Sequence, residues 1–190
     1  MMLVKQLISM LKIIKPLIDK KGIFVFSDPA GAKACLSIAN ELSNQNIIVI
    51  SDRKYSFYTD FDSNVQIYQE SSLNDLFDSF LPDYVFTGTS LPGKLEVKFL
   101  NEAKKREIFT YSFVDHWLNI KERFHLNDTY CFPMQLCVID NNAKELAIEE
   151  GIPAEILSVS GNPYYDFLAK WKQLISKNEM LLKLGLPINS

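Results

Sequence analysis

The stretch GIFVFSDPAGAKACLSIANEL, residues 22–42, contains the pattern from which the fold of this chain can be predicted. Residues 23–27 form a short, nearly continuous apolar run, as expected for a strand that is covered on both faces. A polar turn follows, and the apolar residues from Ala32 to Leu42 then recur with helical spacing. A strand, a turn and a helix in this order are the repeating unit of a parallel sheet covered by helices.

The same alternation continues along the chain. Further strands are predicted at residues 47–51, 65–68, 83–88, 107–114, 135–140 and 155–161, and further helices at 73–80, 92–106, 142–151 and 163–176. We therefore expect an α/β fold, with a Rossmann-like parallel sheet of about seven strands and helices on both faces.

The composition indicates a globular protein with a sizeable core. The chain has 190 residues, of which 47% are hydrophobic, and a formal net charge of −3. Because its charges are mixed rather than clustered, no nucleic-acid partner is predicted. Cys35, Cys131 and Cys137 form no CxxC pair and are predicted to be buried, reduced thiols in a cytoplasmic protein. Their spacing relative to the two histidines matches no usual zinc pattern, and we predict neither a metal nor a cofactor.

Residues 1–21 are predicted to form an amphipathic helix that bends or ends near Pro16. Lysines interrupt its apolar runs well before the ~20 residues that a membrane span requires. Two interpretations remain open. The apolar face packs on the core, or residues 1–18 lie on an anionic membrane surface, which would make the protein peripheral to the inner membrane.

Functional residues are expected where the predicted strands end, because ligands of parallel α/β sheets bind outside the carboxyl ends of the strands. The segments at these ends include SDPAG (27–31), TGTSLPG (87–93), DHW (115–117) and SGNPYYD (160–166). The candidate substrate-binding residues are Asp28, Gly31, Thr87, Thr89, Ser90, Trp117 and Asn162. Their hydroxyl, carboxylate and amide groups can bind a sugar or phosphate, or can simply cap helices.

The first of these segments lacks the motifs of the usual nucleotide sites. A dinucleotide fold would have GxGxxG at this position, and only Gly31 is present; the chain has no Walker A pattern either. The start of a helix at residues 30–33 can still hold an anion through its free N–H groups. Alternatively, Asp28 caps this helix.

Asp115 and His116 are the candidate catalytic residues. A carboxylate beside an imidazole can orient the ring and raise its basicity, and Trp117 can stack on a sugar or a base. We take His116, oriented by Asp115, as the candidate general base, and Asp115 acting alone as the second choice. The alternative is a histidine bonded to the backbone and a tryptophan in the core. Glu122 and Arg123 are interpreted as an ordinary solvated pair.

SGNPYYD resembles the GN-x-x-x-D segment that closes the first domain of UDP-N-acetylglucosamine 2-epimerases and related GT-B-type glycosyltransferases, with Gly161, Asn162 and Asp166 as the matching residues. SDPAGAKACLSIANEL is similar to the opening loop and first helix of those domains. Asp115 lies where the epimerases carry an acidic residue at a strand end. The stretch FVDHWLNIKERF is closer to uncharacterised bacterial polysaccharide-biosynthesis proteins of this superfamily.

The resemblance implies the N-terminal, acceptor-side domain of a sugar-nucleotide-dependent glycosyltransferase in bacterial surface polysaccharide biosynthesis. Its implied partners are a nucleotide sugar and a glycan or lipid-linked acceptor. Residues 22–162 would form the Rossmann-like domain, and residues 163–190 a linking helix toward an absent second domain. Because that second domain carries most nucleotide-sugar contacts in the family, the isolated chain is expected to be inactive. A homodimer through the final helix is left open.

Two alternatives accompany this reading. The epimerases have a Gly-Asp pair after the fourth strand, where this chain has Thr87-Gly88-Thr89 without an acid. This departure makes a non-hydrolysing sugar-nucleotide 2-epimerase the alternative enzyme. The third hypothesis is a non-catalytic binding module of the same fold.

Overall fold

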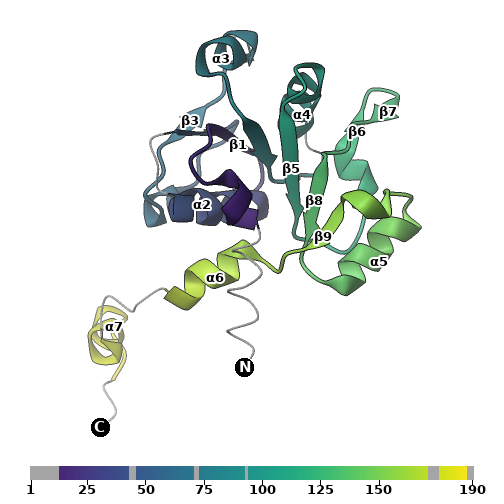
Figure 1. Ribbon diagram of the computed structural model, residues 1–190. Coiled ribbons are helices and arrows are strands. Elements are labelled where there is room, and N and C mark those ends of the chain that lie inside the picture. Colours follow the sequence, from purple (N-terminus) through teal and green to yellow (C-terminus); the bar gives the residue numbers. More distant parts are fainter. Residues whose placement is uncertain (1–12, 43–45, 71–72, 93, 171–175, 188–190) are drawn as a thin grey trace.

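A computed structural model of the chain describes residues 13–42, 46–70, 73–92, 94–170 and 176–187. Its centre is a seven-stranded sheet with the strand order β3-β2-β1-β4-β5-β8-β9, in which every neighbouring pair is parallel (Figure 1). The strands are β1 (Gly22–Phe26), β2 (Ile47–Ser51), β3 (Val65–Ile67), β4 (Tyr84–Thr87), β5 (Phe109–Val114), β8 (Gln135–Val138) and β9 (Leu157–Val159). The predicted Rossmann-like sheet of seven strands is therefore confirmed.

The strand order reverses between β1 and β4. The chain starts at β1, adds β2 and β3 on one side, and returns to place β4 on the other side. Gly22 of β1 is accordingly in register with both Ile47 and Tyr84. In open α/β sheets, the carboxyl ends of the strands at such a reversal are the usual ligand position.

The connecting helices largely match the predictions. They are α2 (Pro29–Leu42), α3 (Leu73–Phe80), α4 (Leu95–Lys105), α5 (Asn141–Glu149), α6 (Pro163–Lys170) and α7 (Lys177–Lys183). Short 3₁₀ helices are η1 (Lys15–Leu17), η2 (Ser56–Asp60), η4 (Lys121–Phe124) and η5 (Ala154–Ile156). Helix α4 begins three residues later than predicted, after a cis Leu91–Pro92 bond. An unpredicted antiparallel hairpin, β6 (His125–Leu126) and β7 (Thr129–Tyr130), follows η4.

The two faces of the sheet bury different sets of side chains, as the alternation of a strand requires. In β1, Phe24 and Phe26 join the cluster under α2, whereas Ile23 and Val25 join the cluster under α3 and α4. Helix α6 packs beside α2 on the first face (Figure 1). A third cluster, around Phe124, joins α4 and α5.

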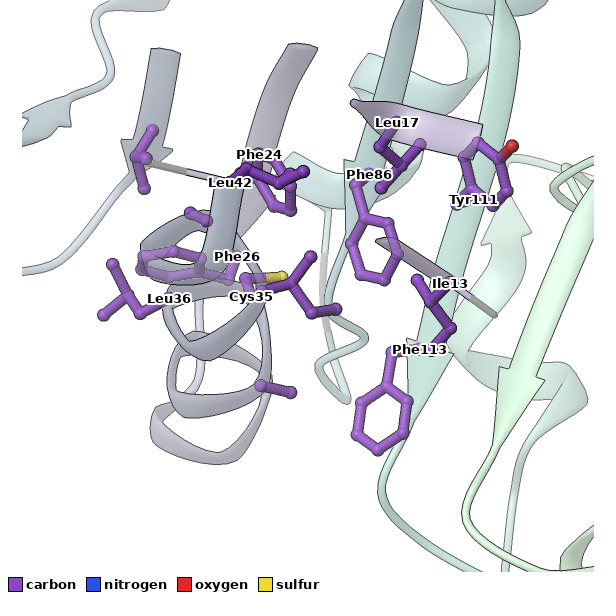
Figure 2. Close-up of a cluster of buried hydrophobic side chains, with 14 of the residues drawn as sticks. Ile13, Leu17, Phe24, Phe26, Cys35, Leu36, Leu42, Phe86, Tyr111 and Phe113 are labelled. Carbon is purple, nitrogen blue, oxygen red and sulfur yellow. The ribbon is translucent and has the colours of Figure 1, made fainter. Parts of the chain in front are cut away.

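The end of the N-terminal segment belongs to the core. Ile13, Ile14 and Leu17 are buried in the cluster under α2, and Figure 2 shows Ile13 and Leu17 beside Phe86 and Tyr111 of the sheet. Core packing therefore accounts for residues 13–17, while residues 1–12 lie outside the described part. Within the described ranges, no helix combines the length and apolar character needed to cross a membrane.

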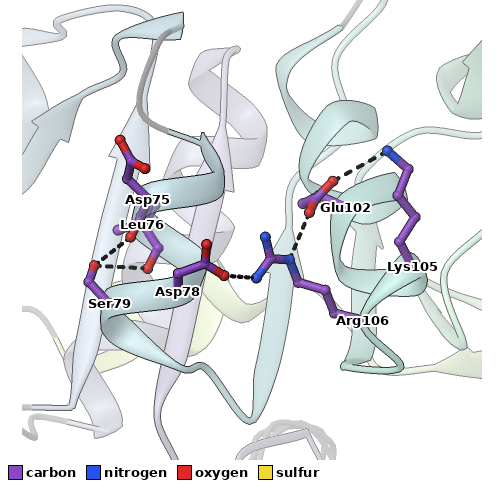
Figure 3. A network of polar contacts seen from close by, with 7 residues as sticks. All are labelled: Asp75, Leu76, Asp78, Ser79, Glu102, Lys105 and Arg106. Carbon is purple, nitrogen blue, oxygen red and sulfur yellow. Dashed lines mark hydrogen bonds and ion pairs between the residues drawn. The ribbon is translucent and has the colours of Figure 1, made fainter.

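Helices α3 and α4 are joined by a network of charged side chains at the surface. The Arg106 guanidinium contacts Asp78 of α3, and its Nε donates to Glu102 Oε1 at 2.7 Å (Figure 3). Lys105 adds a second contact to Glu102 at 3.3 Å. The hydrogen bond from Arg106 holds the pKa of Glu102 below its usual value. The network joins the last turn of α4 to α3, at the end of the helix opposite to the first turn that reaches the candidate site.

The three cysteines are free and buried, as predicted. Burial raises the pKa of the Cys35 thiol well above its usual range, and it raises the pKa of Cys137 to about 11. Both thiols are therefore protonated and unreactive at neutral pH, which fits a role in packing.

Candidate functional site

The first turn of α2, which follows β1, and the loop after β4 are in contact through the backbone of two glycines, Gly31 and Gly88. A Cβ atom on Gly88 would lie 2.8 Å from the Cα of Gly31, and a Cβ on Gly31 would lie 3.2 Å from the Cα of Gly88. Neither residue has a positive φ angle, so the requirement for glycine here is spatial. Gly31, a predicted ligand-binding residue, thus brings the first turn of α2 against the loop after β4.

We predict that Gly88→Ala destabilises the protein by about 1–3 kcal/mol, because the new methyl group meets backbone atoms that cannot rotate away. Gly31→Ala should cost less, since its closest carbon contacts are longer. Urea denaturation followed by circular dichroism measures both changes. A Gly88→Ala protein as stable as the unmodified chain would contradict this packing.

Asp28 caps helix α2. Its Oδ1 accepts the N–H of Gly31 at 2.7 Å, and its backbone carbonyl accepts the N–H of Ala32 at 2.9 Å. Burial raises the pKa of Asp28, and the nearby charge of Asp115 raises it further, while Gly31 and Arg123 act in the opposite direction. The charges of Asp115 and Arg123 thus act on Asp28, although the three residues derive from different loops. An anion at the start of α2 would compete with the Asp28 cap.

A buried carboxylate, Glu96 in the first turn of α4, joins the same loops. Its Oε1 accepts the backbone N–H of Ser27 at 2.9 Å and the hydroxyl of Ser90 at 2.8 Å, and its Oε2 accepts the Ser27 hydroxyl at 3.1 Å. The side chain is almost inaccessible, and burial raises its pKa. Sequence analysis missed Glu96, because an acid in the first turn of a helix is common at the surface.

The hydroxyl groups at the end of β4 and in the loop that follows it form hydrogen bonds within the protein. Thr87 lies inside the sheet, where its Oγ1 and the Oγ of Ser112 are 2.6 Å apart, and Thr89 Oγ1 donates to the carbonyl of Phe113 at 3.1 Å. Thr87, Thr89 and Ser90 are all buried. In this structure these three predicted binding residues hold the loop in shape and do not face solvent.

Asp115, His116 and Trp117 follow the carboxyl end of β5. His116 is exposed, and its Nδ1 accepts the backbone N–H of Leu118 at 3.1 Å. Among the described residues, no hydrogen bond joins Asp115 to His116. A nitrogen that accepts a hydrogen bond carries no proton, so the neutral ring has its proton on Nε2, which is then a donor.

Trp117 lies at the surface rather than in the core. Its side chain is 42% exposed, and the indole N–H donates to both carboxylate oxygens of Asp140, at 3.2 and 3.1 Å. Asp140 also caps α5 by accepting the N–H of Ala143. The ring is thereby held between the loops after β5 and β8, with surface available for stacking.

Arg123 is a residue whose role sequence analysis misjudged. Its Nη1 donates to the carbonyl of Thr89 at 2.9 Å, and its Nε is buried without a hydrogen-bond partner among the described residues. The interpretation as a solvated pair is wrong, since Glu122 bonds to Tyr130 instead. The spacing of Ile120 and Phe124 could have indicated the position of Arg123. Both apolar residues are buried on one face of η4, and this orientation also turns Arg123 inward.

Asn162 serves the start of α6. Its Oδ1 accepts the N–H of Tyr164 at 3.0 Å, and its carbonyl accepts the N–H of Tyr165 at 3.0 Å. The preceding Gly161 has a φ angle of 69°. The resemblance noted for this segment therefore coincides with a helix start, a local structural requirement.

Across the described ranges, no group of three or more His, Cys, Asp or Glu side chains is placed to hold a metal ion. The site is instead a set of loops after β1, β4 and β5 that carries the carboxyl groups of Asp28 and Asp115 and is joined to Arg123 through its bond to Thr89. Such a set can accept a proton and bind polar groups of a ligand.

No family model and no curated protein matches the sequence. Solved structures do match. The S. aureus MnaA–UDP co-structure has a TM-score of 0.61 at 14% identity, covering 87% of this chain and 51% of that chain. UDP-N-acetylglucosamine 2-epimerase from Rickettsia bellii has a TM-score of 0.60 at 16% identity, covering 88% of this chain and 52% of that chain. Anabaena HepE in complex with UDP-glucose has a TM-score of 0.56 at 14% identity, covering 86% of this chain and 50% of that chain.

The chain thus spans about half the length of each matched structure. At these identities the similarity concerns the fold alone; the matched structures are a UDP-N-acetylglucosamine 2-epimerase and complexes with UDP and with UDP-glucose. The chain therefore has the Rossmann-like α/β fold found in these structures.

Proposed function

We propose that this chain is the acceptor-side half of a nucleotide-sugar-dependent glycosyltransferase that acts in bacterial surface polysaccharide synthesis. The observation that carries the proposal is the position of the loops after β1 and β4 at the reversal of strand order, where Asp28 caps α2 and Arg123 donates to the carbonyl of Thr89. Open α/β sheets bind their ligands at this position. Further support comes from the matched structures, which are about twice as long and include complexes with UDP and UDP-glucose.

In the reaction we propose, the acceptor hydroxyl attacks the anomeric carbon of the sugar. A new glycosidic C–O bond forms, the bond to the diphosphate breaks, and the nucleoside diphosphate leaves with the electron pair. The proton of the acceptor hydroxyl passes to a general base on this chain. The complete enzyme, meaning this chain together with a second nucleotide-binding domain, would bind the nucleotide.

The geometry favours Asp115 over His116 as this base. Because Nδ1 of His116 accepts a hydrogen bond from Leu118, the neutral ring offers a proton at Nε2 and has no free lone pair. The Asp115 carboxylate can accept a proton, and Arg123 offsets the charge of the neighbouring Asp28. In this proposal His116 donates a hydrogen bond to the substrate, and Trp117 stacks on a sugar ring.

The test incubates the complete enzyme with UDP-N-acetylglucosamine or UDP-glucose and follows both sugar and nucleotide by NMR. A glycosyltransferase releases UDP and forms a new glycoside only when an acceptor is present. An epimerase changes the sugar signals without net release of UDP, and a binding module leaves the nucleotide sugar intact. Either of the last two results would refute the proposal.

A further inference from the structure

We propose that a cavity between α4 and the β6–β7 hairpin binds a multiply charged oxyanion, namely a phosphate or diphosphate group. The cavity has a volume of about 470 Å³, and its lining includes none of the candidate site residues described above. Its lining residues are Lys94, Val97, Lys98, His125, Leu126 and Asn127. A volume of this size is within the range of small-ligand sites in proteins.

The lining supplies hydrogen-bond donors and positive charge without an acid. Lys94 precedes α4, and its ammonium group has no ion-pair partner among the described residues. Lys98 lies one helical turn further along, on the same side of α4. The His125 ring and the Asn127 amide add donors from the hairpin. Two lysines, an imidazole and an amide that line one space can donate to phosphate oxygens, with Lys98 exchanging its contact to Glu70 for the ligand.

The walls of the cavity are held in place by the core and by the hairpin. Val97 is buried in the cluster around Phe124, and His125 pairs with Tyr130 in the hairpin register. The His125 ring packs edge-on against the Tyr130 ring, with 5.4 Å between the centroids. Asn127 occupies the two-residue turn with a φ angle of 54°. A site on such fixed elements loses little entropy when a ligand binds.

Three acids lie beside the lining residues without being part of the lining: Glu70, Glu122 and Asp128, which follows Asn127 in the turn. Glu70 pairs with Lys98, and its side chain is 81% exposed, so solvent screens the pair. Glu122 accepts a hydrogen bond from the Tyr130 hydroxyl behind the His125 ring. Lys121 lies over the other side of the hairpin, 4.6 Å from the Tyr130 ring centroid. Among the residues that line the cavity the charged groups are Lys94 and Lys98, although the whole chain carries −3.

Inorganic pyrophosphate, titrated into the ¹⁵N-labelled chain and followed by NMR, tests the proposal. The amide signals of Lys94, Lys98, His125 and Asn127 should shift together and saturate. The double variant Lys94→Glu/Lys98→Glu should weaken binding about tenfold or more, since two charge-assisted contacts become repulsive. Lys20→Glu, the same charge change before β1 at the opposite end of the strands, should leave the affinity unchanged.

The same titration is repeated with inorganic phosphate and with UDP. A Kd for UDP well below that for pyrophosphate would identify a nucleoside diphosphate as the occupant, whereas equal values would identify the phosphate groups alone. Shifts that fail to saturate, or an affinity that the double variant leaves unchanged, would overturn the proposal. The result does not depend on the glycosyltransferase proposal, because no catalytic activity is measured.

Discussion

Replacing Asp115 with asparagine is expected to lower turnover of the complete enzyme about 10²–10⁴-fold, the usual contribution of a general base. The amide has the size of the carboxylate but cannot take the proton from an acceptor hydroxyl. Binding of the nucleotide sugar should change little, because the loss concerns the transition state. Initial rates with saturating donor, together with a donor titration, measure the two quantities separately.

His116→Gln is the matched control for Asp115→Asn. Glutamine retains a hydrogen-bond donor near the position of Nε2, so turnover should fall by about tenfold or less if His116 only donates a hydrogen bond. A large loss at His116 and a small loss at Asp115 would reverse the two roles. Thermal unfolding of both variants shows whether folding is affected, which is not expected for these partly or fully exposed side chains.

Replacing Glu96 with alanine is expected to lower the free energy of unfolding by about 3 kcal/mol. The change leaves the buried N–H and hydroxyl of Ser27 and the hydroxyl of Ser90 without their acceptor, and each unsatisfied group costs about 1–3 kcal/mol before relaxation. Glu96→Gln should cost about 1 kcal/mol or less, since its carbonyl can accept two of these bonds. Urea denaturation at pH 7 measures both, and equal stability of the two variants would contradict the role of the carboxylate.

Glu96 should also make the stability depend on pH. Because burial raises its pKa in the folded state, the folded protein retains this proton more strongly than the unfolded chain does. The resulting stabilisation is complete below the ordinary pKa of glutamate and is lost as the pH rises through the folded value. Glu96→Gln does not titrate, so its stability relative to the unmodified chain should improve from pH 4 to pH 7. A constant difference would show that the pKa is not raised.

The sheet could be predicted because each strand is a local feature of the sequence. Runs such as IFVF in β1 and IIVI in β2 are apolar on both faces, as central parallel strands must be. The start of α4 was less predictable. Proline is common in first helical turns, so Pro92 suggested the start of a helix. The residues before Leu95 instead form a loop whose buried hydroxyls bond to other elements.

The candidate site could be predicted only in part, because its contacts join distant segments. The strand-end rule located Asp28 and Asp115, but nothing local indicates that Arg123 reaches Thr89, 34 residues earlier. Glu96 and Ser27 are 69 residues apart, so no local pattern indicates their hydrogen bonds either. Conversely, Thr87 and Ser90 looked available for a ligand, because the sequence does not reveal that their partners are Ser112 and Glu96.

The contact between Gly31 and Gly88 has a mechanical consequence. With only Cα hydrogens between the two backbones, the first turn of α2 and the loop after β4 have no side chains that could slide or rotate past each other. Ser27 and Ser90, which flank this contact, are bonded to the same carboxylate. We therefore expect little relative movement of these two segments, so that adjustment to a ligand involves the exposed residues around His116.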